Sequence, residues 1–93
     1  MNCFLVNQKI MSDSIVIDVR TKEEYRSGHV EGSINIPLQE ISSKENEIMS
    51  FKKHIVFCCA SGTRSGHAAS YFSAKGLSCE NGGSWLEVQS NIL

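Results

Sequence analysis

The 93-residue sequence has no long hydrophobic run and no strong excess of charge of either sign. Its formal net charge of −1 leaves no polybasic surface of the kind that binds nucleic acid or an acidic membrane. The opening stretch, MNCFLVNQKI, is too short and too polar for the core of a signal peptide. We therefore expect a cytoplasmic protein of one domain, residues 1–93, whose partners are small molecules rather than nucleic acid or membrane.

Paired cysteine spacings are also missing. The four cysteines, at positions 3, 58, 59 and 79, form no C-x-x-C pair and no Cys/His quartet. This excludes the usual patterns of a disulfide framework, a structural zinc site and a thioredoxin-type redox pair. Free thiols persist in a reducing compartment, so we expect them to be unpaired.

Short apolar runs alternate with helix signals along the chain. Residues 15–17 and 55–59 are β-branched and do not alternate with polar residues, as in strands buried on both faces of a parallel sheet. Weaker strand patterns cover residues 4–6, 34–36 and 78–80. Strands and helices in alternation predict an α/β fold with a mainly parallel, five-stranded sheet flanked by helices.

Three capping boxes mark helix starts: Thr21 to Glu24, Ser42 to Glu45 and Ser84 to Glu87. The longest predicted helix runs over residues 64–75, and Gly76 is its expected C′ residue.

A cysteine stands where the strand over residues 55–59 ends, and a polar loop that opens a helix follows it. Such a loop turns backbone N–H groups toward the sulfur and adds the positive end of the helix, which lowers a thiol pKa. Gly62 allows a sharp turn, and Arg64 adds a charge that faces a bound anion or holds the loop. We interpret this loop as a cradle for an anionic group on sulfur.

The spacing leaves two candidates for the nucleophile. Counted from Cys58, the arginine is sixth, which satisfies the bare C-x5-R spacing of cysteine-dependent phosphatases. However, Ser61 then replaces the glycine of the tyrosine phosphatase signature, and Phe57 replaces its histidine. Counted from Cys59, the pattern is C-A-S-G-T-R-S.

That second pattern resembles the active-site loop of rhodanese-type sulfurtransferases, C-R-x-G-x-R-S. The stretch IDVRTKEEYRSGHVEGSINIP, from Ile17 to Pro37, is similar to the other signature of the family, I-D-V-R-x-x-x-E-[FY]-x-x-G-H-I-x-G-A-x-N-I-P. NGGSWLEVQ, near the end, resembles the glycine pair and tryptophan-bearing helix of the family. The resemblance extends from about Ile15 to the end of the chain and suits a single-domain form.

The resemblance implies a three-layer, doubly wound α/β fold and transfer of a sulfane sulfur from a donor, such as thiosulfate or a persulfide, to cyanide or a thiol. It implies that Cys59 forms a persulfide, without a metal or an organic cofactor. The expected partners are small sulfur compounds or a thiol protein. The residues matched to the cradle are Ala60, Ser61, Gly62, Thr63, Arg64 and Ser65.

One departure from the family pattern concerns charge. Ala60 stands where many members have arginine, so Arg64 is the only cation of the loop. Because thiosulfate is a dianion, we expect a persulfide or polysulfide to be at least as good a donor. Ser33, where the family usually has alanine, is expected to be harmless.

Plainer roles apply to several residues near these motifs. We expect Asp18, Arg20 and Glu24 to form a polar network that ties the first helix to the sheet, with Asp18 and Arg20 behind the site. His29 is a candidate base, although such a turn histidine more often bonds backbone carbonyls. Packing or solvent positions are expected for four others: Cys58, His67, Cys79 and Trp85.

Two other functions remain open from the sequence. One is a phosphatase or arsenate reductase that uses Cys58 or Cys59, although no aspartate lies in or beside the loop. The other is a non-catalytic carrier that holds a persulfide for one partner protein.

Overall fold

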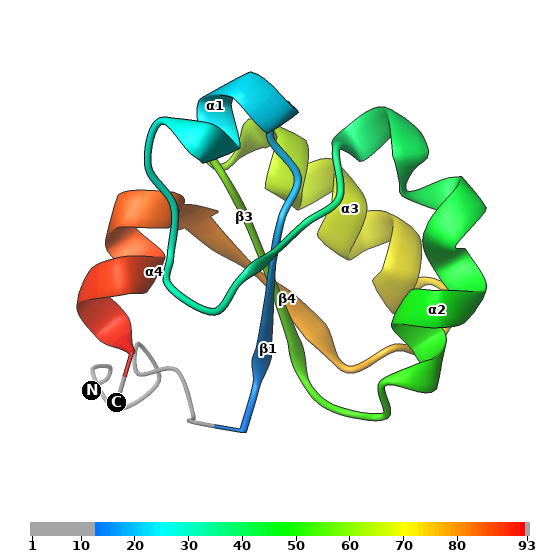
Figure 1. Ribbon diagram of the computed structural model, residues 1–93. Coiled ribbons are helices and arrows are strands. Elements are labelled where there is room, and N and C mark those ends of the chain that lie inside the picture. The colour runs from blue at the N-terminus through cyan, green and yellow to red at the C-terminus, as the bar shows by residue number, and fades with distance from the viewer. Residues whose placement is uncertain (1–12, 93) are drawn as a thin grey trace.

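Strands and helices alternate along the chain in the computed structural model, which describes residues 13–92 (Figure 1). The elements, in order, are β1 (Ile15–Asp18), α1 (Lys22–Arg26), β2 (Ile34–Asn35), the 3₁₀ turns η2 (Leu38–Glu40) and η3 (Ser42–Lys44), α2 (Glu45–Ser50), β3 (Ile55–Cys59), α3 (Thr63–Ser73), β4 (Cys79–Ser84) and α4 (Trp85–Asn91).

The sheet has four strands within this range, in the order β2-β1-β3-β4, and every neighbouring pair is parallel. This confirms the predicted α/β fold with a parallel sheet. The predicted strand over residues 4–6, which would be the fifth, and Cys3 lie outside the described residues.

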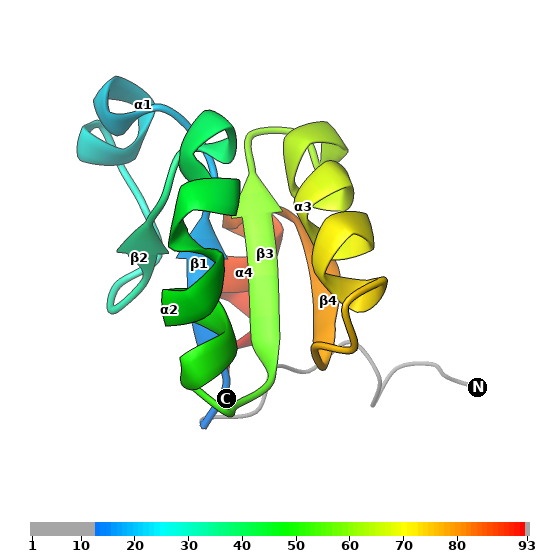
Figure 2. The ribbon, with the colours of Figure 1, turned by 90° about the vertical axis from the view of Figure 1, so that its right-hand side faces the viewer.

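Helices cover both faces of the sheet. Figure 2 shows α2 and α3 on one side of the strands and α4 on the other. The side chains of β3 alternate accordingly: Ile55, Phe57 and Cys59 belong to the core under α2 and α3, whereas Val56 and Cys58 face Val88 of α4. All five β3 residues are buried, which explains why this strand has a continuous apolar sequence.

Local signals place three of the helix ends. Thr21 and Ser84 each cap a helix in a complete capping box, as predicted for α1 and α4. The predicted helix over residues 64–75 corresponds to α3, after which Gly76 and Leu77 donate to the carbonyls of Ser73 and Phe72. α3 itself ends at Ser73, before the predicted end, and this Schellman arrangement closes the turn that follows it at Gly76.

The predicted capping box from Ser42 to Glu45 is wrong. Ser42 lies within η3, and α2 begins after Lys44 without a side-chain cap. An N-cap residue needs non-helical dihedral angles, but consecutive 3₁₀ turns continue through Ile41 and leave Ser42 no such conformation.

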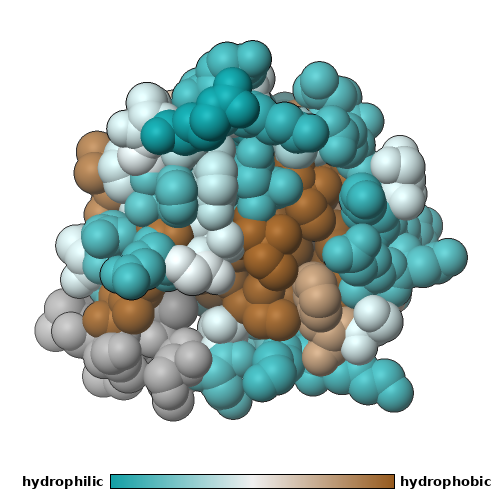
Figure 3. Space-filling view, in the orientation of Figure 1, coloured by the Kyte–Doolittle hydropathy of each residue, from teal (hydrophilic) through white to brown (hydrophobic). Residues whose placement is uncertain are grey.

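Polar groups gather at the carboxyl edge of the sheet. β1 and β3 are parallel, so Asp18 and Cys59 both lie where their strands end at this edge, and α1 lies above it (Figure 1). Figure 3 shows hydrophilic side chains over α1 and a hydrophobic area lower on the same face, between α1 and α2. Within residues 13–92, no helix combines the length and the hydrophobicity needed to cross a membrane.

Candidate active site

Cys59 is the last residue of β3, and its buried thiol lies beneath the loop that leads into α3. The backbone N–H of Gly62 donates to Cys59 Sγ at 2.9 Å. The N–H and the hydroxyl of Ser65 both lie 3.4 Å from the same sulfur. Gly62, the N-cap of α3, has a φ of 99°, a conformation that favours glycine and turns this N–H inward.

These donors change the acidity of the thiol. Burial raises the pKa of Cys59, but hydrogen bonds from Ser65 and from the backbone N–H groups of Ser61 and Gly62 stabilise the thiolate and together lower the pKa below its ordinary value. The thiolate is the nucleophilic form of cysteine, so this site favours the reactive state.

The thiol of Cys58 lies on the other face of the sheet, in the core under α4, as predicted from strand alternation. Burial and the negative charge of Asp18 raise the pKa of Cys58 to about 12. Cys79 lies away from Cys58 and Cys59, because it is the first residue of β4 and pairs with Ile55 at the start of β3. Its sulfur lies 3.4 Å from Ser73 Oγ at the end of α3. Cys79 thus packs between β4 and α3, as expected.

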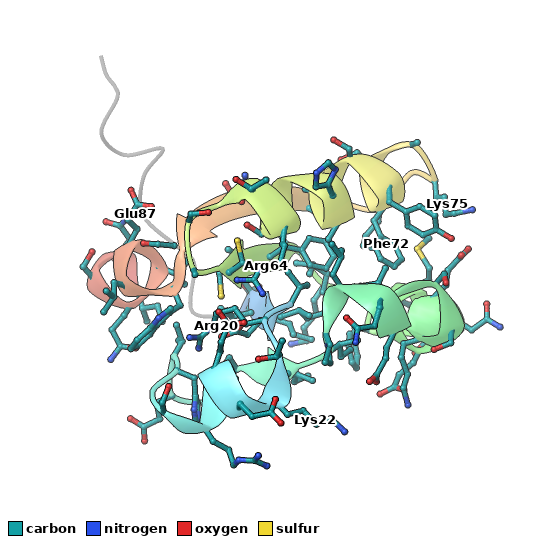
Figure 4. All side chains as sticks on the ribbon, turned by 90° about the horizontal axis from the view of Figure 1, so that it is seen from above. Arg20, Lys22, Arg64, Phe72, Lys75 and Glu87 are labelled. Carbon is teal, nitrogen blue, oxygen red and sulfur yellow. The ribbon has the colours of Figure 1, made fainter. Side chains whose placement is uncertain are left out.

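Arg64 forms a two-point ion pair with Glu24 of α1. Arg64 Nη1 and Nη2 donate to the two carboxylate oxygens of Glu24 at 2.8 and 3.0 Å. Figure 4, which looks onto the carboxyl edge, shows Arg64 reaching from α3 toward α1, with Arg20 beside it. The hydrogen bonds from Arg64 and Thr21 lower the pKa of Glu24 to about 2, so the carboxylate stays charged.

The predicted network of Asp18, Arg20 and Glu24 therefore needs a correction. Asp18 and Arg20 do pair, with contacts of 2.8 to 3.0 Å in a buried setting, but Glu24 bonds to Arg64 instead. Arg20 also donates to the Gly28 carbonyl at 2.6 Å, and its guanidinium lies 5.0 Å from the ring centre of Trp85. Arg20 thus connects β1 to the turn after α1 and to α4.

The two histidines considered in the sequence lie at the surface. His29 Nδ1 is 2.7 Å from the carbonyl of Tyr25, and the two rings stack at 3.7 Å, which agrees with the expected backbone contact. His67 is exposed on α3.

The outer residues of the loop are neutral and open to solvent. Ala60, Ser61 and Thr63 are all exposed, and the hydroxyls of Ser61 and Thr63 lie 3.4 Å apart. Within residues 13–92, no group of three or more His, Cys, Asp and Glu side chains is arranged to hold a metal ion.

The sequence motifs did not identify Asn81. Its side chain contacts Ser65 at 2.6 Å and the Gly62 carbonyl at 2.9 Å, and so it holds the loop from β4. The available signal was its position between the predicted strand over residues 78–80 and the glycine pair.

Comparison with known proteins gives consistent matches. The sequence matches the Rhodanese-like domain family over residues 5–87. It is 38% identical to the putative sulfur carrier protein YrkF of Bacillus subtilis, over 75% of this chain and 38% of YrkF. It is 36% identical to thiosulfate sulfurtransferase PspE of Escherichia coli, over 77% of this chain and 71% of PspE.

The structural comparison agrees. A rhodanese with anions from E. coli matches with a TM-score of 0.72 and 33% identity, covering 80% of this chain and 89% of that one. The chain spans 38% of the length of YrkF and less than half of a second B. subtilis relative.

Proposed function

The chain belongs to the rhodanese-like domain family, as its sequence motifs predicted, and on that basis we propose that it transfers a sulfane sulfur through a persulfide on Cys59. Sulfur transfer is the general activity that the family and its named relatives support. Beyond this general activity, we propose that Cys59 is the nucleophile, that residues 60–65 form the cradle, and that the substrates are a sulfane sulfur donor and a thiol or cyanide acceptor. We propose further that residues 1–93 act as one domain.

The convergence of donors on Cys59 is the observation that carries this proposal. Gly62 and Ser65 address the sulfur from the loop, and hydrogen bonds lower the pKa of the thiol despite its burial. The same donors suit a persulfide, which is also anionic, as an oxyanion hole suits a developing oxyanion. Cys58 has neither the loop donors nor a lowered pKa. Its thiol faces the core on the α4 side of the sheet, and its pKa is raised.

The reaction has two displacements. The Cys59 thiolate attacks the sulfane sulfur of the donor, a new S–S bond forms, and the donor leaves as a thiolate, or as sulfite when the donor is thiosulfate. An acceptor thiolate or cyanide then attacks the outer sulfur of the Cys59 persulfide. Its S–S bond breaks, the acceptor becomes a persulfide or thiocyanate, and the Cys59 thiolate is restored.

The charge at the loop favours a persulfide donor over thiosulfate. The charge of Arg64 is balanced by Glu24, and Ala60, Ser61 and Thr63 are uncharged. A dianion therefore gains little from entering the site, whereas a persulfide carries its single charge on the reacting sulfur.

Mass spectrometry after incubation with a sulfane donor tests the proposal. We expect the wild-type chain to gain the mass of one sulfur atom and to lose it on addition of cyanide. Cys59→Ser should abolish the gain, and Cys58→Ser, which alters the adjacent thiol, should keep it. Sulfur uptake by the Cys59→Ser variant, or loss of uptake in the Cys58→Ser variant, would show that Cys59 is not the nucleophile.

A carrier function is the second candidate, because the relative YrkF is named a putative sulfur carrier. A carrier and a transferase share the Cys59 persulfide but differ in turnover. Repeated thiocyanate formation with excess donor and cyanide supports a transferase, whereas release of the sulfur to one protein partner alone supports a carrier. Hydrolysis of an aryl phosphate without thiocyanate formation would instead favour the phosphatase alternative.

A further inference from the structure

Asn81 of β4 contacts two of the residues that donate hydrogen bonds to Cys59, Gly62 and Ser65. Its Nδ2 donates to the Gly62 carbonyl at 2.9 Å, and its Oδ1 accepts from the Ser65 hydroxyl at 2.6 Å. Gly62 and Ser65 in turn supply the hydrogen bonds to the sulfur. One carboxamide thus links β4 to two of the residues that donate to the sulfur.

The orientation of this carboxamide follows from its partners. Oδ1 also accepts from the backbone N–H of Gly83 at 3.0 Å, so it receives two hydrogen bonds. A flipped amide would place its NH₂ against the Gly83 N–H and its oxygen against the Gly62 carbonyl, with like groups facing each other. Asn81 therefore needs both a donor and an acceptor, and an aspartate supplies only acceptors.

A bulge in β4 places Asn81 at the loop. Phe57 pairs with Asn81, but Cys58 pairs with Gly83, so Gly82 is the extra residue. A Cβ atom at position 82 would lie 2.6 Å from a Val88 methyl and 2.7 Å from a Val56 methyl, which leaves room only for glycine. The glycine pair thus lets the strand bulge next to the active cysteine.

The Ser65 hydroxyl lies between two acceptors. It is 2.6 Å from Asn81 Oδ1 and 3.4 Å from Cys59 Sγ, and a hydroxyl has one hydrogen to donate. Asn81 consequently holds this hydroxyl beside the sulfur and competes with the sulfur for its hydrogen. The same distances put Oδ1 no more than about 6 Å from Sγ.

We propose that Asn81 is a positioning residue for sulfur transfer: its carboxamide sets where Gly62 and Ser65 meet the sulfur of Cys59. This inference rests on the proposed function of Cys59. Asn81 itself makes no step in the reaction.

Asn81→Asp gives the sharpest test. The carboxylate loses the donor to Gly62 and adds a negative charge near Sγ, and both changes disfavour the thiolate, so we expect the pKa of Cys59 to rise by roughly one unit. The pH dependence of iodoacetamide alkylation, followed on the Cys59 peptide by mass spectrometry, measures it. Asn46→Asp, the same change at an exposed position on α2, is the control and should titrate like wild type.

Asn81→Ala provides a second measurement that does not depend on thiol ionisation. At a pH above the Cys59 pKa of every variant, the rate of sulfur transfer should fall roughly tenfold because the loop donors lose their support. A wild-type titration curve for Asn81→Asp, or a wild-type rate for Asn81→Ala, would overturn the proposal.

The alkylation assay needs no sulfur donor, so it separates this proposal from the proposed function. If the wild-type chain takes up sulfur and Asn81→Asp titrates normally, only the role of Asn81 is overturned. If the wild-type chain takes up no sulfur, the proposed function fails, even if Asn81→Asp raises the pKa of Cys59.

Discussion

Cys58 and Cys59 are adjacent, yet their thiols are shifted in opposite directions. Strand alternation turns one sulfur into the core under α4 and the other under the loop donors. The pKa of Cys58 is raised to about 12 by burial and Asp18, whereas hydrogen bonds outweigh burial and lower the pKa of Cys59. The side of the sheet that each thiol faces therefore decides the direction in which its pKa is shifted.

This contrast predicts opposite effects on stability at alkaline pH. The raised pKa of Cys58 contributes stability below the unfolded value of 9.0 that is lost as pH rises from there toward 12. The Cys58→Ala variant lacks this thiol and therefore avoids the loss. Between pH 7 and pH 10 its free energy of unfolding should fall by about 1 kcal/mol less than that of wild type. Urea unfolding under reducing conditions, at pH 7 and pH 10, measures the difference.

Cys59→Ala is the matched comparison. The lowered pKa of Cys59 contributes stability that appears as pH rises through its folded value and is complete above 9.0. Without this thiolate, Cys59→Ala should lose more stability than wild type on the way to pH 10. If the free energies of unfolding of the two variants changed with pH in the same way, the pKa values of Cys58 and Cys59 would not be shifted in opposite directions.

At the scale of elements, the Glu24–Arg64 pair joins α1 to α3 above the loop. Both side chains are about one-third exposed, so the pair contributes modestly to stability, roughly 0.5 kcal/mol after solvent screening. Its larger effect is on charge, because it balances the only cation of the loop. If the site transfers sulfur as proposed, the pair should influence which donors react there.

Glu24→Gln should free this charge while keeping the cap of α1, since the glutamine oxygen still accepts from the Thr21 N–H. We expect kcat/KM for thiosulfate to rise severalfold at low salt and the gain to shrink as salt screens Arg64. Wild type should react faster with glutathione persulfide than with thiosulfate. Steady-state rates with both donors check these expectations.

Glu23→Gln is the matched control, because Glu23 is the residue of α1 that precedes Glu24, and its carboxylate lies 4.0 Å from Arg26 instead. It should leave kcat/KM for thiosulfate unchanged. Equal gains in both variants would point to net charge rather than to the Arg64 pair.

At the scale of the whole molecule, the Asp18–Arg20 pair connects three parts of the fold. Asp18 is fully buried at the end of β1, and Arg20 reaches the Gly28 turn and the Trp85 ring of α4. The carboxylate accepts from the backbone N–H of Arg20 as well as from its guanidinium. A buried ion of this kind is stable only while its partner remains.

Arg20→Met should therefore destabilise the protein by about 3 to 5 kcal/mol, because it leaves the Asp18 carboxylate buried and unpaired. Asp18→Asn combined with Arg20→Met should recover much of this loss, as urea unfolding would measure. Folded Arg20→Met protein should still take up one sulfur, since its contacts are structural. A cost below 1 kcal/mol, or folded protein without sulfur uptake, would contradict this role.

Sequence patterns predicted much of this molecule. They located β1 and β3, the capping boxes of α1 and α4, the glycine turn at Gly76 after α3, and the cysteine at the loop. These features depend on contacts between residues close in the chain, or on strand alternation, and local sequence specifies such contacts. The Ser42 box failed because consecutive 3₁₀ turns, which no local pattern indicated, occupied its position.

Tertiary structure alone decided the contacts that complete the site. Glu24 bonds to Arg64, 40 positions away, rather than to Arg20, and Asn81 reaches Ser65 across 16 positions. Both contacts exist because parallel crossovers bring the carboxyl edges of β1, β3 and β4 together, and the bulge at Gly82 sets the register beside Cys59. The sequence specifies which groups are present and how each short segment folds, but only the packing of the sheet determines which distant groups are close enough to bond.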